Sequence, residues 1–186
     1  MISWTNGKDT GIISSYLSTS GAAPPDPAQR KNILPLHIYI DADACPVKQE
    51  TYHVAERYGL NVTLVANSWM RAPEKKWLKL IVVNDNLDAA DDWIAENVKE
   101  NDIVISGDIP LASRCLKKGA LVLGTTGKEF SESDIGNALA ARDLMKELRE
   151  AGTITGGPAQ FQKKDRSRFL QSLDQMIQRV RKRNGH

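Results

Sequence analysis

The 186-residue sequence has few cysteines, few histidines and little net charge. Its two cysteines, Cys45 and Cys115, lie far apart and form no CxxC pair, which argues against a disulfide framework and against a zinc site. The three histidines form no pair with the spacing of metal ligands. The formal net charge of +2 is close to balance, so the total charge identifies no class of partner.

The sequence also lacks a long apolar run. No stretch is apolar enough to span a membrane, and serines directly follow Ile12-Ile13, so the apolar block of a signal peptide is missing. We therefore expect a cytoplasmic protein with no membrane partner. Residues 1–35 are rich in Gly, Ser, Thr and Pro, and we interpret them as a disordered or extended N-terminal extension. The oligomeric state is not indicated.

From residue 36 onward, apolar strands alternate with amphipathic helices. The pattern predicts strands over 37–41, 61–66, 79–83, 102–106 and 120–123. It predicts helices over 46–58, 88–99, 111–118, 133–150 and 164–181, and a short crossover that is helical around 74–78. Such alternation is typical of a parallel sheet. The expected fold is α/β, a three-layer α/β/α domain over 36–182 with a five-stranded parallel sheet of order 3-2-1-4-5, two C-terminal helices and a tail at 183–186.

Aspartates follow three of the predicted strands, as Asp41 and Asp43, then Asp88, Asp91 and Asp92, then Asp108. The carboxyl ends of parallel strands meet at one edge of a sheet, where ligands of open α/β sheets bind. Two carboxylates about 4 Å apart repel by about 4 kcal/mol at an effective dielectric near 20, and a hard divalent cation would remove this cost. The pattern predicts an Mg²⁺ or Mn²⁺ site whose ligands are Asp41, Asp43, Asp88, Asp92 and Asp108.

Helix capping is the alternative role for these acids. Asp43 would cap the helix that starts at Pro46, while Asp88 and Asp108 would cap the helices that follow them. Acids in the first turn also interact favourably with the helix dipole. Because capping explains one or two of the three acids at 88–92, Asp92, which lies a turn inside the helix, is the better ligand candidate there.

Four further residues are candidates for binding substrate phosphates, namely Lys48, Arg71, Ser106 and Arg166. Each has a structural alternative: a solvated lysine, an arginine that closes a loop, or a serine that ends its strand. Residues 163–186 carry eight Lys or Arg and two Asp. This basic segment is compatible with guiding nucleic acid toward the acidic edge, and equally with a solvated helix face.

Several blocks of sequence resemble the YaiI/YqxD family of uncharacterised bacterial proteins over residues 37–180. They are Asp41–Lys48, Asp88–Glu96, Asp108–Ala112, Arg142–Met145, Thr155–Pro158, and Asp165-Arg166 with Phe169. That family is in turn similar to PIN-like (NYN-like) nucleases, in which an Asp ends strand 1, an acid opens the helix after strand 3 and an Asp ends strand 4. Asp41, Asp88 or Asp92, and Asp108 stand at those positions.

The resemblance implies a PIN-like fold and an Mg²⁺- or Mn²⁺-dependent nuclease that hydrolyses phosphodiester bonds, usually in RNA. Asp41, Asp92 and Asp108 would be its catalytic residues, and nucleic acid its partner. Fold alone does not establish activity, so this function stays an expectation.

Two other functions are compatible with the sequence. A phosphatase of the haloacid-dehalogenase type has Asp-x-Asp after strand 1, so Asp41 would be its nucleophile and Asp43 its general acid. That class, however, carries its acidic pair late in the chain at a strand end, whereas Asp91-Asp92 comes early and within a helix. The other alternative is a non-catalytic PIN-like module that binds RNA or protein and keeps its carboxylates only as caps.

Overall fold

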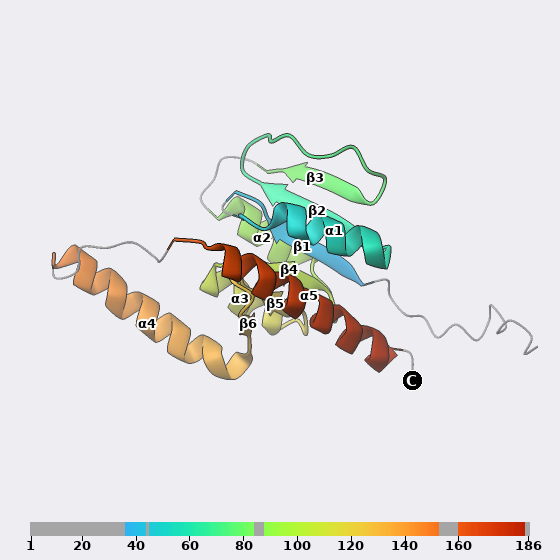
Figure 1. Ribbon diagram of the computed structural model, residues 1–186. Helices are drawn as coiled ribbons and strands as arrows, with labels where there is room; N and C mark the ends of the chain where they lie inside the picture. Colours follow the sequence, from blue (N-terminus) through green and yellow to red (C-terminus); the bar gives the residue numbers. More distant parts are fainter. Residues whose placement is uncertain (1–35, 44, 84–87, 153–159, 185–186) are drawn as a thin grey trace, which may run out of the picture. The chain divides into compact units, whose positions relative to one another are not determined.

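A computed structural model describes residues 36–43, 45–83, 88–152 and 160–184 (Figure 1). The extension predicted at 1–35 lies outside these ranges, as do residues 185–186 of the predicted tail. Across the described ranges the chain forms a six-stranded sheet and five helices. The α/β class expected from the sequence is thereby confirmed.

The strands are β1 (His37–Asp41), β2 (Asn61–Ala66), β3 (Leu78–Val82), β4 (Ile103–Ile105), β5 (Leu121–Leu123) and β6 (Glu129–Phe130). Their order in the sheet is β3-β2-β1-β4-β5-β6, and the first five are parallel as predicted. The sixth strand was not predicted. It pairs antiparallel with β5 and is only two residues long, too short to leave a periodic pattern in the sequence.

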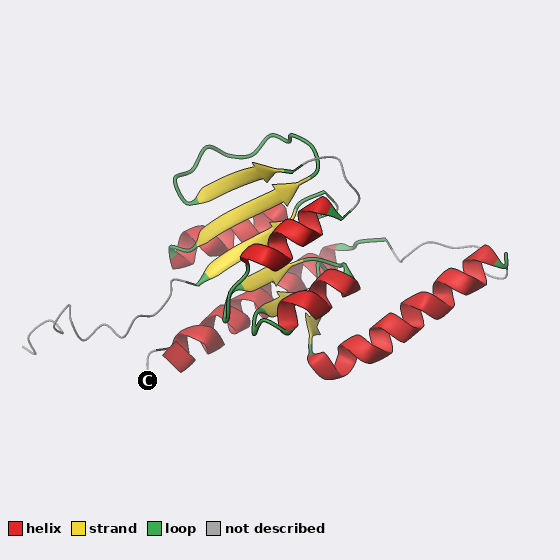
Figure 2. Ribbon diagram, turned by 180° about the vertical axis from the view of Figure 1, so that it is seen from behind, coloured by secondary structure: helices red, strands yellow, loops and turns green. Residues whose placement is uncertain are grey.

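The helices are α1 (Lys48–Tyr58), α2 (Ala89–Asn97), α3 (Ile109–Leu116), α4 (Glu132–Glu150) and α5 (Lys163–Asn184). Side chains of α1 and α5 share one apolar core with one face of the sheet. Side chains of α2 and α3 share a second core with the other face, to which Ile135 of α4 also belongs. The two cores define three layers, which the opposite views of Figures 1 and 2 show from either side. None of the described helices is both long and apolar enough to cross a membrane.

The central strand β1 shows why the sequence forms this sheet. Ile38 and Ile40 are fully buried in the first core, whereas Tyr39 points to the opposite face and is buried in the second. A strand covered by helices on both faces needs apolar side chains at successive positions, and this run supplies them. Ile40 pairs with Ile105 of β4, so the chain leaves both strands at the same level of the sheet.

The predicted helix around 74–78 is wrong. Residues 67–77 form an irregular loop, and β3 already begins at Leu78. The Trp77 carbonyl accepts a hydrogen bond of 2.8 Å from Val62 N, and the Trp77 ring lies 6.3 Å from that of Tyr52. Leu78 N donates a hydrogen bond of 3.1 Å to the Lys75 carbonyl, so a single turn leads directly into β3, and pairing with β2 prevents this turn from continuing as a helix. Tertiary contacts thus override the local pattern.

Candidate active site

A cavity of about 320 Å³ opens at the carboxyl edge of the sheet. Its walls come from the ends of β1 and β4, the first turn of α2, the start of α3 and the turn between β5 and β6. The lining residues are Asp41, Cys45, Asp91, Ser106, Gly107, Asp108 and Thr125. Three carboxylates from three separate segments therefore face one space, at the edge where the parallel topology predicts a ligand site.

Ser106 links the two acids that follow the central strands. Its hydroxyl donates a hydrogen bond of 2.9 Å to Asp41 Oδ2, and its Oγ accepts one of 2.9 Å from the Asp108 amide. Asp108 also caps α3, because its Oδ1 accepts a hydrogen bond of 2.8 Å from Leu111 N. The capping role and the position in the cavity, which the sequence left as alternatives, are thus both present in Asp108.

Asp91 is the third acid of the cavity, and the sequence argument did not select it. Burial, the largest cause, and the charges of Asp108, Asp41 and Asp88 together raise the pKa of Asp91 to about 6. The charge of Arg114 opposes this shift. The contribution of three neighbouring acids to this pKa shift indicates an excess of negative charge at the site.

Asp41 experiences the same field. Burial raises the pKa of its carboxyl above the ordinary value, and the charges of Asp43 and Asp108 raise it further. The hydrogen bond from Ser106 and the charge of Lys48 act in the opposite direction. The site therefore favours the protonated form of these acids, and a bound cation would likewise reduce the repulsion between the ionised carboxylates.

Asp92 and Asp88, the two acids of α2 that the sequence favoured, do not line the cavity. Asp92 Oδ1 lies 2.8 Å from Arg114 Nη2, and its side chain is 60% exposed. Asp88 is exposed and stands at the N-cap of α2 in the left-handed conformation, but its side chain accepts no hydrogen bond from an amide of the first turn. Its charge nevertheless reaches Asp91.

A helical pattern could have identified Asp91. Asp91, Ile94, Ala95 and Val98 follow one another at intervals of three, one and three residues, which places them on one face of α2. Ile94, Ala95 and Val98 are buried in the second core, so the same face turns Asp91 inward. Asp92 is aligned instead with Glu96, which is exposed.

Asp43 lies outside the cavity and does not cap α1. Its Oδ2 accepts a hydrogen bond of 2.9 Å from Asn67 N, which ties the chain after β1 to the chain after β2. The N-cap position of α1 is Val47, which has no side-chain cap. Asp43 contributes to the cavity through its charge, by raising the pKa of Asp41.

The candidate phosphate-binding residues lie in different places. Lys48 Nζ donates a hydrogen bond of 2.7 Å to the Ala42 carbonyl, close enough to Asp41 for its charge to lower the pKa of that acid. Arg166 forms an ion pair with Glu50 and lies over the Phe161 ring at 5.3 Å. Arg71 is exposed in the β2–β3 loop, outside the acidic cavity. Ser106 is the one member of the four that lines the cavity.

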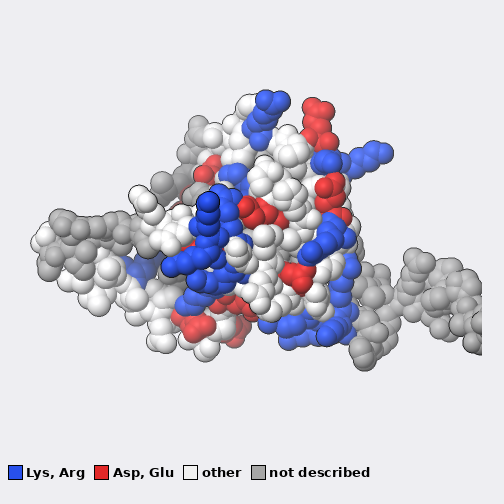
Figure 3. Space-filling view, viewed as in Figure 1, with Lys and Arg blue, Asp and Glu red and all other residues white. Residues whose placement is uncertain are grey.

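Basic side chains on the face viewed in Figure 3 gather toward the two ends of α5. Several of them have partners within the fold. Arg179 pairs with Glu129, Arg168 Nη2 lies 3.8 Å from Asp165 Oδ1, and Arg181 bonds the Tyr58 carbonyl. Two of these basic side chains thus hold α5 against its neighbours, Arg179 against β6 and Arg181 against the end of α1.

The donor set of the cavity suits a hard cation, because carboxylate and hydroxyl oxygens are the ligands of Mg²⁺ and Mn²⁺. Cys45 adds no soft donor, since burial raises the pKa of its thiol to about 11. In the described part of the chain, no three His, Cys, Asp or Glu side chains lie close enough together to hold a metal ion. The residues therefore fit a cation in their chemistry, while the spacing of their side chains is wider than direct ligation of one ion requires.

Fold and cavity together define an α/β protein with a partly buried acidic site at the carboxyl edge of a parallel sheet. Residues 39–179 match the family model described as "Uncharacterized BCR, YaiI/YqxD family", and the chain belongs to this family. No solved structure matches the chain.

Several relatives are UPF0178 proteins of bacteria. The protein of Paramagnetospirillum magneticum is 57% identical over 145 residues, which are 78% of this chain and 96% of the relative. That of Rhodospirillum rubrum is 55% identical over 148 residues, 79% of this chain and 99% of the relative. That of Nitrobacter winogradskyi is 53% identical over 147 residues, 79% of this chain and 94% of the relative.

Proposed function

We propose that the chain is a divalent-cation-dependent hydrolase of phosphodiester bonds that acts on RNA. The observation that carries the proposal is the meeting of Asp41, Asp91 and Asp108 in one cavity at the carboxyl edge of the sheet. The raised pKa values of Asp41 and Asp91 support it, because they indicate negative charge that a cation would neutralise.

Asp41, Asp91 and Asp108 would hold Mg²⁺ or Mn²⁺ partly through water molecules, because their spacing is wider than direct ligation of one ion requires. Ser106 would keep the Asp41 carboxylate oriented through its 2.9 Å hydrogen bond. A bound ion of this type supplies a water of lowered pKa and neutralises charge on a phosphate. Asp91 takes the place that the sequence argument gave to Asp92, because Asp91 faces the cavity and Asp92 pairs with Arg114.

RNA is proposed as the substrate from the likeness to PIN-like nucleases together with the cations around the cavity. The charge of Lys48 reaches Asp41. Arg168 and Phe169 lie against Gly127, in the same turn that carries Thr125 into the cavity. An acidic site bordered by cations allows a phosphodiester to approach without net repulsion.

The test is cleavage of an end-labelled single-stranded RNA with Mg²⁺ or Mn²⁺, compared with cleavage in EDTA. We expect Asp91→Asn and Asp108→Asn to lower the rate by about 100-fold or more, because changing the outer-shell partners of metal ligands already costs about 10–100-fold. Asparagine also caps helices well, so Asp108→Asn should keep α3 intact. Glu96→Gln, which removes an exposed acid from the same helix as Asp91, is the matched control and should cleave at the wild-type rate. Equal rates for wild type and Asp108→Asn would contradict the proposal.

A non-catalytic RNA-binding module is the second candidate. The observation that favours it is the absence, in the described ranges, of three acidic, histidine or cysteine side chains close enough to hold one ion. RNA binding without cleavage at millimolar Mn²⁺ would support this alternative. The phosphatase hypothesis has less support, because Asp43 does not line the cavity beside Asp41 and its Oδ2 accepts a hydrogen bond from Asn67 N.

A further inference from the structure

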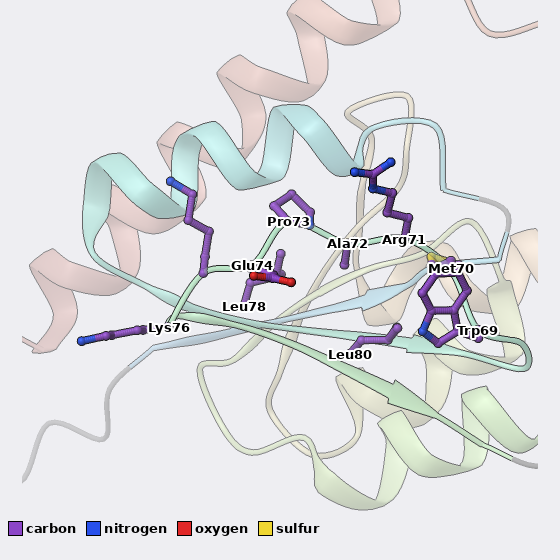
Figure 4. A pocket seen from close by; sticks show the side chains of 10 residues that line it. Trp69, Met70, Arg71, Ala72, Pro73, Glu74, Lys76, Leu78 and Leu80 are labelled. Atoms are coloured by element: carbon purple, nitrogen blue, oxygen red, sulfur yellow. The ribbon is translucent and has the colours of Figure 1, made fainter.

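A second hollow lies at the edge of the sheet remote from β6. It is a groove of about 1170 Å³ between the β2–β3 loop and strand β3, and we call it the β2–β3 groove. Leu78 and Leu80 line it from β3, while Trp69, Met70, Arg71 and Lys76 line it from the loop (Figure 4). The groove is larger than the pockets of about 300–1,000 Å³ that hold single small molecules, so an extended ligand suits it better.

The exposed aromatic residue of this groove is Trp69, whose exposed fraction is 76%. An indole ring left in water has no role in the core, whereas it offers a flat surface on which a nucleobase can stack. The neighbouring Met70 is only partly exposed and packs against the first core, which anchors the loop beside Trp69.

The groove is also basic. Arg71 and Lys76 line it and are exposed, and neither has an ion pair or hydrogen bond with another described residue. Lys75 is different, because its Nζ lies 2.9 Å from Glu56 Oε1. Glu74 is the one acid among the lining residues. Sites that bind single-stranded nucleic acid combine basic side chains, which contact the phosphates, with exposed aromatic rings, on which the bases stack.

The groove leads to the edge that carries the acidic cavity. Figure 4 shows Trp69 and Arg71 toward one end of the groove and Lys76 toward the other. Trp69 follows Asn67 by two residues, and Asn67 N donates the 2.9 Å hydrogen bond to Asp43. Asp43 in turn follows Asp41 by two residues, so the Trp69 end of the groove and the cavity lie along the same carboxyl edge of the sheet.

We propose that the β2–β3 groove binds single-stranded nucleic acid, with a base stacked on Trp69 and phosphates held by Arg71 and Lys76. This inference rests on the proposed function insofar as it names where the RNA substrate is held outside the acidic cavity. Charge and shape decide the occupant. A peptide strand could pair with the edge of β3, but it would use neither the indole face nor the two cations that have no ion pair with a described residue.

The test measures binding in EDTA, so that it does not depend on cleavage. Fluorescence anisotropy with a labelled oligouridylate of about 12 nucleotides gives the dissociation constant at several salt concentrations. We expect Trp69→Ala to weaken binding by about ten-fold and Trp69→Phe to restore most of it, because a phenyl ring can still stack. Arg71→Gln should reduce the slope of log K against log salt by about 0.7, the value for one phosphate contact with a single strand.

Lys117→Gln is the matched control, since Lys117 is an exposed lysine that follows α3 on the opposite face of the sheet. It should leave both the affinity and the salt slope unchanged. Double-stranded RNA should bind more weakly than oligouridylate, because its bases cannot stack on Trp69. Absence of oligouridylate binding by the wild type, or equal affinity of wild type and Trp69→Ala, would overturn the proposal and leave the groove to a peptide. Binding through Trp69 in EDTA, together with no RNA cleavage in the separate assay with Mg²⁺ or Mn²⁺, would instead refute only the hydrolase.

Discussion

The Ser106 hydroxyl donates a hydrogen bond of 2.9 Å to Asp41 Oδ2. The two residues directly follow paired positions, because Ile40 of β1 lies opposite Ile105 of β4. This bond therefore arises from the register of two parallel strands, and it fixes one carboxylate of the acidic cavity.

Replacing Ser106 by alanine should destabilise the fold by about 1–3 kcal/mol. The serine is 1% exposed, and its loss leaves both Asp41 Oδ2 and the Asp108 amide without this partner. Urea denaturation at neutral pH measures the change. Ser113→Ala, the same substitution on α3 at a residue that is not fully buried, should stay within about 0.5 kcal/mol of wild type. An equal loss of unfolding free energy in both variants would show that the hydrogen bonds of Ser106 do not contribute specifically to stability.

Asp91→Asn should make the metal-free protein more stable at pH 8 and leave it nearly unchanged at pH 4. The folded pKa of Asp91 is raised from 3.8 to about 6, so the folded state binds the proton more tightly than the unfolded state. Wild-type stability consequently falls as pH rises from about 4 to about 6, and asparagine removes this loss. Because Asp91 is only partly buried, solvent screening reduces the gain to about 1 kcal/mol.

The measurement is the free energy of unfolding in EDTA across this pH range. Glu96→Gln, the control on the exposed side of α2, should show no such dependence on pH in its stability relative to wild type. A stability difference between Asp91→Asn and wild type that is the same at pH 4 and pH 8 would mean that the acids do not interact as the structure indicates.

Gly127→Ala and Gly136→Ala should change stability in opposite directions. Gly127 has φ +82°, and a Cβ there would lie 2.7 Å from Phe169 N, so alanine would strain the turn that carries Thr125 and push it from α5. We expect a loss of about 2 kcal/mol or more. Gly136 lies in α4 with no atom near its virtual Cβ, and alanine there should add about 0.5–1 kcal/mol. Thermal denaturation of both variants tests the pair, and a stable Gly127→Ala would contradict the close approach.

The sequence was sufficient for the parallel sheet, because β1, β2, β4 and β5 are mostly apolar runs bounded by turns and alternate with helices. It was insufficient where long-range contacts decide the structure. Residues 74–78 contain a local helical signal, but Trp77 lies in the turn that enters β3, where its carbonyl accepts a hydrogen bond from Val62 N and its ring packs near Tyr52. Strand β6 forms by pairing with the edge of β5, which is a long-range contact. Its two residues are too few to show a strand periodicity in the sequence.

The same limit explains the choice between Asp91 and Asp92. Successive residues on a helix are separated by about 100°, so an error of one position turns a carboxylate from the core to solvent. The sequence argument assigned the first acids of the helix to capping, which left Asp92 as the candidate ligand. Counting from the buried residues Ile94 and Ala95 would have selected Asp91, since the packed face, rather than the cap, sets the rotation of α2.

Thermal stability with and without Mn²⁺ distinguishes these two aspartates directly. If an ion binds the folded cavity at a concentration 100-fold above its Kd, it adds about 2.7 kcal/mol, or roughly 5–10 °C in Tm for a domain of this size. We expect this rise for wild type and for Asp92→Asn, whose acid pairs with Arg114, and little or no rise for Asp91→Asn or Asp41→Asn. A rise that is lost in Asp92→Asn but kept in Asp91→Asn would restore the assignment made from the sequence. Equal rises in all four proteins would place the ion elsewhere, because a ligand can stabilise the fold only through the residues that hold it.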